Sequence, residues 1–309
     1  MSRVLRPRSL SIAIAVLAIV VAACGSSAGT ASPSAVPSAT PAGTVAPSSG
    51  PAGSPSPSVA TAPGLLLAVT SEGGFINPAA TIGALPQLVV DTDGRIYTPG
   101  VSTGSTTPLI APVDVRDTGA AGAAAILAAM KTAGLDTEGS GGVAADAGST
   151  VFTAVIDGVT VVSRFAGGGG PGPVNHGGGA PGDSGAPGAA AMALLAQLAD
   201  PSVAWGGSSG NAIPYAARAY RVWTAPAAAD AGTGGAPIAW PLSTGPTDFG
   251  SPAAADLGVT GLRSGIVIGK DATTLAGSLA SAAPGTLVTA GGKTWQVWVR
   301  VVFPDELGS

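Results

Sequence analysis

Residues 87–98 read QLVVDTDGRIYT, and this stretch says more about the fold class than any other. Two apolar runs rich in β-branched residues flank Asp93-Gly94, and glycine readily takes the positive φ that a tight turn needs. The stretch therefore predicts an antiparallel hairpin. Similar patterns recur at residues 150–165, around Asp157-Gly158, and at residues 286–303, around Gly291-Gly292. Three hairpins favour antiparallel sheets.

An alanine-rich stretch follows the first hairpin and predicts a helix over residues 119–133. Asp117 or Thr118 can cap its N-terminus, because short polar side chains accept hydrogen bonds from the first free backbone N–H groups. Gly134 is placed to end the helix, and Leu135 is placed to fold back onto the last turn.

Further helices and strands are expected on both sides of these elements. A helix is predicted over residues 187–199, and another follows Asp271, which we expect to cap it. The remaining strands are expected at residues 64–70, 112–116, 215–224 and 265–269. Together these elements predict an α+β fold of antiparallel β-hairpins with two or three helices.

Both halves of the chain place a strand, a capped helix and a hairpin in the same order. This suggests two pseudo-repeated strand-helix-hairpin units, with lobes of about 65–200 and 201–309 sharing one sheet, and a glycine-rich loop over 166–188. Coincidence is the alternative, because such units are common. A solute-binding lipoprotein of the transporter type is disfavoured, since its lobes need repeated strand–helix crossovers rather than hairpins.

The N-terminus carries the pattern of an export signal. Three arginines precede an apolar run over residues 10–21, and the run ends in Val21-Ala22-Ala23-Cys24. A cysteine directly after two alanines predicts a lipoprotein signal peptide over 1–23, with Cys24 lipidated. An uncleaved transmembrane anchor is the alternative, but the run is well short of the roughly 20 residues that span a bilayer. We therefore expect an exported protein anchored by Cys24 to the outer face of the cytoplasmic membrane.

The segment after Cys24 has the composition of a tether. Residues 25–64 consist almost wholly of Ala, Ser, Thr, Pro and Gly and carry no charge. Such a sequence cannot bury enough apolar area to offset chain entropy, so we expect 24–64 to be a disordered linker and 65–309 to be the exported domain. No second cysteine exists to form a disulfide with Cys24.

The charge of the expected mature chain limits its partners. The chain has 13 Lys and Arg against 17 Asp and Glu; without the three signal arginines, 10 remain against 17, a net charge of −7. An acidic protein is poorly suited to nucleic acid. One cysteine and one histidine also leave no set of ligands for a transition metal, and no cofactor is predicted.

Several short stretches match catalytic or binding motifs but lack the structural context that those motifs require. Residues 182–185 match the GDSG of trypsin-like proteases, but the sole histidine, His176, lies in the same glycine-rich loop, without a rigid scaffold. Residues 206–210 fit G-x-S-x-G, yet a loop is expected on both sides rather than a strand and a helix. The glycines at 167, 169 and 172 open no helix for a dinucleotide, and Asp91-Thr92-Asp93-Gly94 suits the hairpin turn better than a calcium loop.

The tryptophans are the most informative residues that remain. Trp295 and Trp298 lie an odd number of residues apart on one expected strand, so their side chains should face opposite sides. Trp205 and Trp240 lie beside expected loops. We therefore consider an exposed aromatic surface formed by these four residues, against the alternative that all of them are structural.

Three stretches carry a family resemblance. They are Glu72-Gly73-Gly74-Phe75 with Leu85-Pro86 and the hairpin, then residues 116–135, and finally Val299 to Glu306. The chain resembles a group of secreted proteins and lipoproteins of high-GC Gram-positive bacteria for which no activity is known. Their ending is of the Arg-Pro-Leu-Leu-Pro-Asp-Glu kind, from which Val301-Val302-Phe303 departs. The resemblance implies export and the domain limits, and no activity.

These observations favour a membrane-anchored, non-catalytic module that binds an envelope protein or a cell-wall component. A small-molecule-binding lipoprotein is the alternative, and a cleft lined by Trp and Arg between the two halves would support it. A hydrolase that uses two facing acids such as Asp114 and Asp305 is a further alternative.

Overall fold

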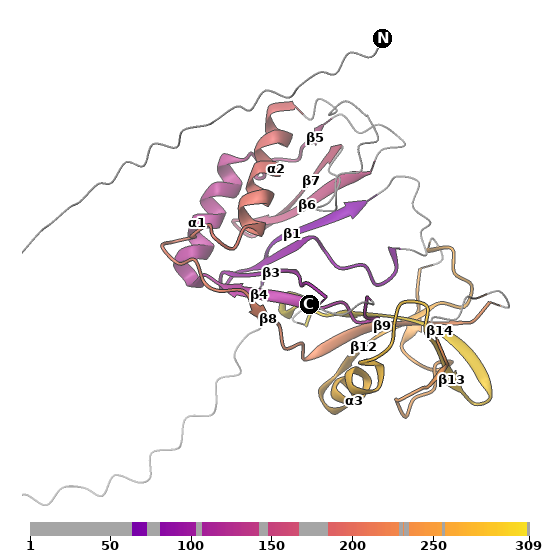
Figure 1. Ribbon diagram of the computed structural model, residues 1–309. Helices are drawn as coiled ribbons and strands as arrows, with labels where there is room; N and C mark the ends of the chain where they lie inside the picture. Colours follow the sequence, from indigo (N-terminus) through magenta and orange to yellow (C-terminus); the bar gives the residue numbers. More distant parts are fainter. Residues whose placement is uncertain are drawn as a thin grey trace, which may run out of the picture. The chain divides into compact units, whose positions relative to one another are not determined.

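The computed structural model describes residues 64–72, 81–102, 107–141, 148–166, 185–228, 231, 235–254 and 257–307. These residues form two β-sheets and three α-helices, which confirms the predicted α+β class (Figure 1). Within them, no helix is long and apolar enough to cross a membrane.

Each sheet has its own set of strands, so the expectation of one shared sheet is wrong. The first sheet has the spatial order β5 (Ser140–Gly141), β7 (Val159–Ala166), β6 (Ser149–Ile156), β1 (Leu65–Glu72), β2 (Leu88–Asp91), β3 (Arg95–Pro99), β4 (Val113–Asp117) and β8 (Ile213–Pro214). The second has the order β10 (Ile238–Ala239), β13 (Leu287–Ala290), β14 (Lys293–Val301), β9 (Ala219–Pro226), β12 (Arg263–Ile268) and β11 (Ser251–Pro252). Along the chain, β8 is the last strand of the first sheet and β9 is the first strand of the second. The two lobes and the internal duplication stay predictions.

The three predicted hairpins are present as β2–β3, β6–β7 and β13–β14. Gly94 turns the first with φ +84°. Both residues of the second turn, Asp157 and Gly158, have positive φ, at 52° and 78°. This is the geometry whose twist matches the flanking strands, and Asp and Gly are the residues that tolerate it.

Helix α1 (Gly119–Thr132) ends as its sequence predicts. Gly134 adopts φ +76°. Its N–H donates to the carbonyl of Lys131 at 3.1 Å, and the N–H of Leu135 donates to that of Met130 at 3.0 Å. This pair of bonds is a Schellman motif, which satisfies carbonyls left free at a helix end. Leu135 is buried against the core, as expected.

Helices α1 and α2 (Gly185–Ala199) lie together on one face of the first sheet (Figure 1). Their apolar residues, among them Ile126, Met130 and Leu198, share a core with Leu67 and Leu88 from the sheet. Burial of aliphatic side chains at this density is the main stabilising contribution to such a layer, about 25 cal/mol for each Å² of apolar surface.

Arg116 fixes the end of α2 from beneath. It is 4% exposed, and its guanidinium donates to the carbonyls of Leu198, Asp200 and Val203 at 2.8–3.0 Å. A cation near the C-terminus of a helix also interacts favourably with the helix dipole. The sequence showed Arg116 only as a charged residue of an alternating strand.

Helix α3 (Gly269–Leu279) covers one face of the second sheet. Leu275 and Leu279, spaced four residues apart, are both buried there, as expected. The expected cap is wrong: Ile268 occupies the N-cap position, and Asp271 lies within the first turn. A carboxylate there can still interact with the helix dipole.

A third core joins the two sheets. Val89, Tyr97 and Val113 of the first sheet pack with Val301, the last residue of β14, and with Phe303, which follows that strand. The rings of Tyr97 and Phe303 meet edge to face, with centroids 5.4 Å apart.

Tyr215 also belongs to this joint. Its N–H donates to the carbonyl of Val113 at 2.8 Å, and its ring lies 5.1 Å from that of Tyr97. The strand expected over 215–224 therefore begins only at Ala219, because Tyr215 pairs with the first sheet instead.

Candidate functional site

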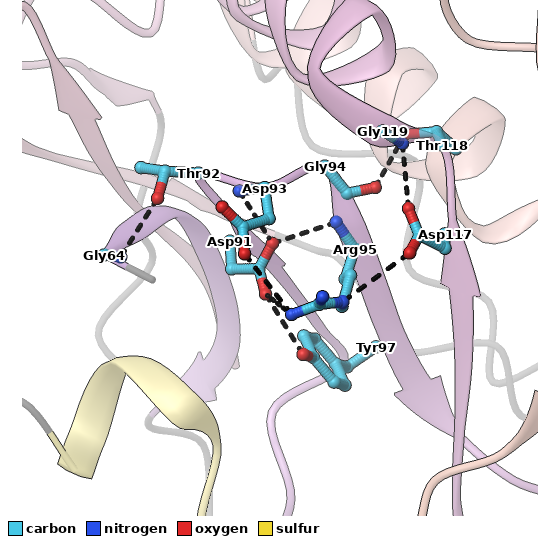
Figure 2. Close-up of polar contacts among 10 residues, drawn as sticks. All are labelled: Gly64, Asp91, Thr92, Asp93, Gly94, Arg95, Tyr97, Asp117, Thr118 and Gly119. Carbon is cyan, nitrogen blue, oxygen red and sulfur yellow. Dashed lines mark hydrogen bonds and ion pairs between the residues drawn. The ribbon is translucent and has the colours of Figure 1, made fainter. Parts of the chain in front are cut away.

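A buried carboxylate stands where the β2–β3 hairpin turns. Asp91 is 0% exposed. Figure 2 shows that its Oδ1 accepts the N–H groups of Asp93 and Arg95, at 3.0 and 2.9 Å. Its Oδ2 accepts the Tyr97 hydroxyl at 3.1 Å and lies 3.8 Å from the Arg95 guanidinium. The carboxylate thus holds the whole turn.

The same turn is bound to α1 (Figure 2). The carbonyl of Gly94 accepts both the N–H and the hydroxyl of Thr118, at 3.0 and 2.6 Å. Asp117 accepts the N–H of Gly119 at 2.9 Å, so of the two expected caps it is Asp117 that bonds the helix N-terminus. A Cβ on Gly94 would overlap the Gly119 carbonyl, so the close approach of hairpin and helix requires glycine.

The electrostatics of Asp91 follow from its burial. Burial raises the pKa of Asp91, while the hydrogen bonds from Arg95 and Tyr97 act against the rise. Burial and the neighbouring Asp91 raise the pKa of Tyr97. Because Asp91 has no exposed surface and both oxygens are bonded, we assign it to the hairpin rather than to chemistry on a substrate. Among the described residues no group of three or more His, Cys, Asp or Glu side chains could hold a metal ion.

The two acids singled out from the sequence, Asp114 and Asp305, are not a facing pair. Asp114 shares a face of β4 with Arg116, and both line a hollow of about 240 Å³ beside the end of α2. Val113, on the opposite face, packs with Phe303, which leads into the 3₁₀ turn that carries Asp305. The first sheet lies between the two carboxyls, so the pairing is wrong.

Asp305 has an unusual environment of its own. Its Oδ1 is buried and has no hydrogen-bond partner among the described residues. Burial raises the pKa of Asp305, and the charges of Glu306 and Asp91 add to the rise. Although burial alone would raise the pKa of Glu306, two hydrogen bonds to Arg300, at 2.6 and 2.9 Å, hold it below its ordinary value.

Two of the four tryptophans proposed as a surface are buried. Trp205, 7% exposed, lies in the core beneath α1 and α2, and Trp295, also 7% exposed, lies in the core beneath α3. The expected aromatic surface is therefore wrong for these two residues. Alternation on β14 does send Trp298 to the opposite face, as predicted.

The other two tryptophans are half-buried in separate places. Trp298 packs with Ile82 in a small cluster on the outer face of the second sheet. Trp240 donates its indole N–H to the carbonyl of Thr244 at 2.7 Å, and its ring lies edge-on to Phe249 at 5.8 Å. The four residues lie in three different clusters, so they form no common surface.

Residues 206–210 form a tight loop, as expected. Trp205 and Ser208 exchange two backbone hydrogen bonds, and Gly206 and Gly207 have positive φ. A Cβ on Gly206 would overlap the backbone at Ala121. The glycines therefore serve the packing of this loop on α1, and no strand leads into Ser208 as a nucleophile elbow would need.

The joint between the sheets is mostly solid. The shared core of Tyr97, Val301 and Phe303 fills it. Beside that core lies a hollow of about 370 Å³, and Leu85, Leu109 and Trp298 are among the residues that line it. No arginine is among the described residues that line it.

A groove of about 970 Å³ lies beside α3, at the end of β12. Tyr220 and small residues of α3 are among the residues that line it. Ile268 and Leu307, which are 63% and 45% exposed, lie at its sides. Arg218, exposed at the rim, has no carboxylate within ion-pair distance among the described residues. Large apolar side chains left in water around a groove are typical of a binding surface.

No sequence pattern indicated this groove, because residues 265–269 form a short apolar run between glycines, which is the pattern of a fully buried strand. Cys24, His176 and Ser184 lie outside the described residues. Compared with known proteins, the chain matches no family model, no curated protein and no solved structure.

Proposed function

We propose that the chain is an exported lipoprotein, held at the membrane by lipid on Cys24, whose folded part is a non-catalytic module that binds an envelope protein. A cell-wall component is the alternative partner within the same function. The observation that carries the proposal is the groove beside α3, lined by exposed Ile268 and Leu307 and by Arg218, for which the described residues offer no ion-pair partner.

The anchoring part of the proposal rests on the order of residues in the N-terminal 24. Three arginines, an apolar run and Val21-Ala22-Ala23-Cys24 follow one another as in a lipoprotein signal. The two acyl chains of a diacylglycerol anchor stably where one chain gives only marginal binding. Labelling of cells with an alkyne fatty acid should modify the wild-type protein, and Cys24→Ala should abolish the label and release the protein from the membrane. A labelled Cys24→Ala protein would refute the anchor.

The binding part rests on the chemistry of the groove. Apolar side walls supply most of the free energy of association, and a rim charge orients the partner. Arg218 favours a partner with an acidic side chain beside its apolar residues. A protein segment meets both demands more readily than a neutral polysaccharide, which would need exposed aromatic side chains.

The test is capture of the partner in intact cells. A photo-crosslinking amino acid at Thr273, which is exposed in the groove, should capture one dominant protein. Leu307→Asp should abolish the capture, because it places a charge on an apolar side wall. Val159→Asp is the matched control: Val159 is 61% exposed on the β6–β7 turn, away from the groove.

The outcomes separate the candidate functions. Capture that survives Leu307→Asp, or an absence of any captured protein, would overturn the protein-binding proposal. Small-molecule binding, the second candidate, is favoured by the Trp298-lined hollow between the sheets, and a ligand there should change Trp298 fluorescence. The third candidate, a hydrolase that uses two facing carboxylates, has lost its proposed pair of acids, since the first sheet separates Asp114 and Asp305.

A further inference from the structure

One edge of the second sheet is covered over only part of its length. Strand β11 pairs with β12 at two positions, Ser251 with Ser264 and Pro252 with Arg263. Strand β12 continues to Ile268, and its other edge pairs with β9 throughout. Among the described residues, no strand pairs with Gly265–Ile268 on the β11 side.

The alternation of the ladder shows which backbone groups this edge presents. The carbonyl of Leu262 accepts the N–H of Ala253 at 2.9 Å, so residue 262 directs its backbone groups toward β11. The N–H and C=O of one residue in a strand point toward the same edge, and the next residue directs its own pair toward the other edge. Residues 264, 266 and 268 therefore share the direction of Leu262. Ile266 therefore presents an N–H and a carbonyl, and Ile268 presents an N–H. Ile268 has extended backbone, with φ −129° and ψ 165°, and as N-cap it gives its carbonyl to α3.

The side chains at this edge are apolar and exposed. Ile266 is 40% exposed and Ile268 is 63% exposed, while Val267 between them is 4% exposed in the core. Next to the same three residues lies a hollow of about 150 Å³, which Leu242, Thr244 and Asp271 also line. A backbone edge, an apolar row and a pocket with one carboxylate thus lie side by side.

We propose that β12 binds an extended peptide segment of the partner protein as an added strand at Ile266–Ile268. This mode takes affinity from main-chain hydrogen bonds and specificity from pockets for alternate side chains. The peptide's β-branched or aromatic side chains lie beside Ile266 and Ile268, and a lysine or arginine between them reaches Asp271. The inference rests on the proposed binding function and names the chemistry of the partner.

A second copy of this chain fits the edge less well than a foreign peptide. A stable protein dimer buries about 800 Å² on each partner, far more than a segment of four residues supplies. Each copy would also bring the same Asp271 and, in the mature chain, a net charge of −7, from 10 Lys and Arg against 17 Asp and Glu. Like charges oppose self-association, and they favour a basic peptide.

The first test is selection of random heptapeptides, displayed on phage, against the immobilised chain from residue 24 onward. We expect the enriched sequences to alternate β-branched or aromatic residues with one lysine or arginine. In the free protein, the amides of Ile266 and Ile268 should exchange with deuterium at least tenfold faster than that of Val267, and a selected synthetic peptide should protect both.

Two variants then locate the site. Ile266→Pro removes one edge N–H and should lower the affinity of a selected peptide at least tenfold, while Ile266→Val should keep it. Proline is tolerated at an edge whose N–H faces solvent. Asp271→Lys should change the charged residue of the selected peptides from basic to acidic. This test does not depend on whether the Ile266→Pro variant folds. Asp136→Lys makes the same change of charge at an exposed site on the first half and should alter nothing.

The inference fails if the enriched peptides do not alternate, if Asp271→Lys leaves their charge unchanged, or if the protein dimerises through this edge. Its failure is distinct from that of the proposed function. A partner crosslinked at Thr273 and retained in Ile266→Pro would keep the binding function and remove the added strand. Loss of capture in Leu307→Asp together with peptide binding at β12 would support both.

Discussion

The two sheets differ in the charged side chains that they bury and in the apolar edge that one of them exposes. The first buries charged side chains: Asp91 is 0% exposed and Arg116 is 4% exposed, and each has three hydrogen-bond partners. The second leaves Ile266 and Ile268 in water at its edge. Buried charges with all bonds formed fix geometry, whereas exposed apolar groups gain free energy only when a partner covers them. We therefore expect the first sheet to carry stability and the second to carry binding.

The joint between the sheets gives the largest expected effect. Phe303→Ala removes a ring that packs on Tyr97, and we expect the free energy of unfolding to fall by about 3–5 kcal/mol. The fluorescence of Trp205 reports on one core and that of Trp295 on the other. In this variant, the two signals should no longer change at the same urea concentration. A loss below about 1 kcal/mol, with transitions still coincident, would show that the sheets do not depend on this joint.

Arg116→Met tests the buried polar framework of the first sheet. The carbonyls of Leu198 and Val203 would lose this donor, whereas the carbonyl of Asp200 also accepts the N–H of Val203, at 3.3 Å. A buried carbonyl left unpaired costs about 1–3 kcal/mol. Arg164→Met is the control: Arg164 is 50% exposed and its ion pair with Glu72 is at the surface. We expect it to change the free energy of unfolding by less than about 1 kcal/mol. Equal losses in urea denaturation would contradict the contrast between buried and exposed arginines.

Neighbouring positions of β12 sharpen the same comparison within one strand. Val267→Thr places a hydroxyl in the apolar core beneath α3. The free energy of unfolding should fall by about 1–3 kcal/mol, because a hydroxyl buried without a compensating hydrogen bond is destabilising. Ile266→Thr, one residue earlier, should cost less than about 1 kcal/mol, since Ile266 faces water. Thermal unfolding of the two variants measures the difference. Equal costs would mean that Ile266 is covered.

The smallest expected effect is a dependence on pH. The pKa of Asp305 is higher in the folded state than its ordinary value of 3.8, so the folded protein binds the proton more tightly than the unfolded chain. Its contribution to the free energy of unfolding therefore increases as pH falls through the folded pKa toward 3.8, and decreases as pH rises. Asp305→Asn should stabilise the protein at pH 7 and change little near pH 4.

The contribution of Glu306 to the free energy of unfolding depends on pH with the opposite sign. Its pKa in the folded state is lower than its ordinary value of 4.5, so its contribution is present above pH 4.5 and is lost as pH falls through the folded pKa. Glu306→Gln should therefore destabilise the protein at pH 7. Chemical denaturation between pH 4 and pH 7 separates the two, with the exposed Asp248→Asn as control. Destabilisation by Asp305→Asn at pH 7 would contradict the assignment.

Local features of the fold were predictable from sequence. Positive φ is required at the turns Asp93-Gly94 and Asp157-Gly158 and at the helix end Gly134. Glycine adopts positive φ readily, so its presence at these positions is a direct sequence signal. The limits of α1 and the buried leucines of α2 and α3 followed from helical spacing in the same way.

The features that depend on tertiary contacts were not predictable. Alternation placed Trp295 and Trp298 on opposite faces of a strand, but it does not say what covers each face. Tyr215 left its expected strand because the first sheet offered a partner at Val113. The free edge at Ile266 and Ile268 follows from the length of β11, a strand of two residues that no local pattern marks.

The bond between Gly94 and Thr118 has a consequence for the order of folding. It joins groups only 24 residues apart, within a continuous run of hairpin, strand and helix from Leu88 to Thr132. Contacts of low sequence separation lose little loop entropy on closing, so this run can form before the long-range pairing of β1 with β6. We expect Thr118→Val to slow refolding in stopped-flow experiments, and Phe303→Ala mainly to speed unfolding.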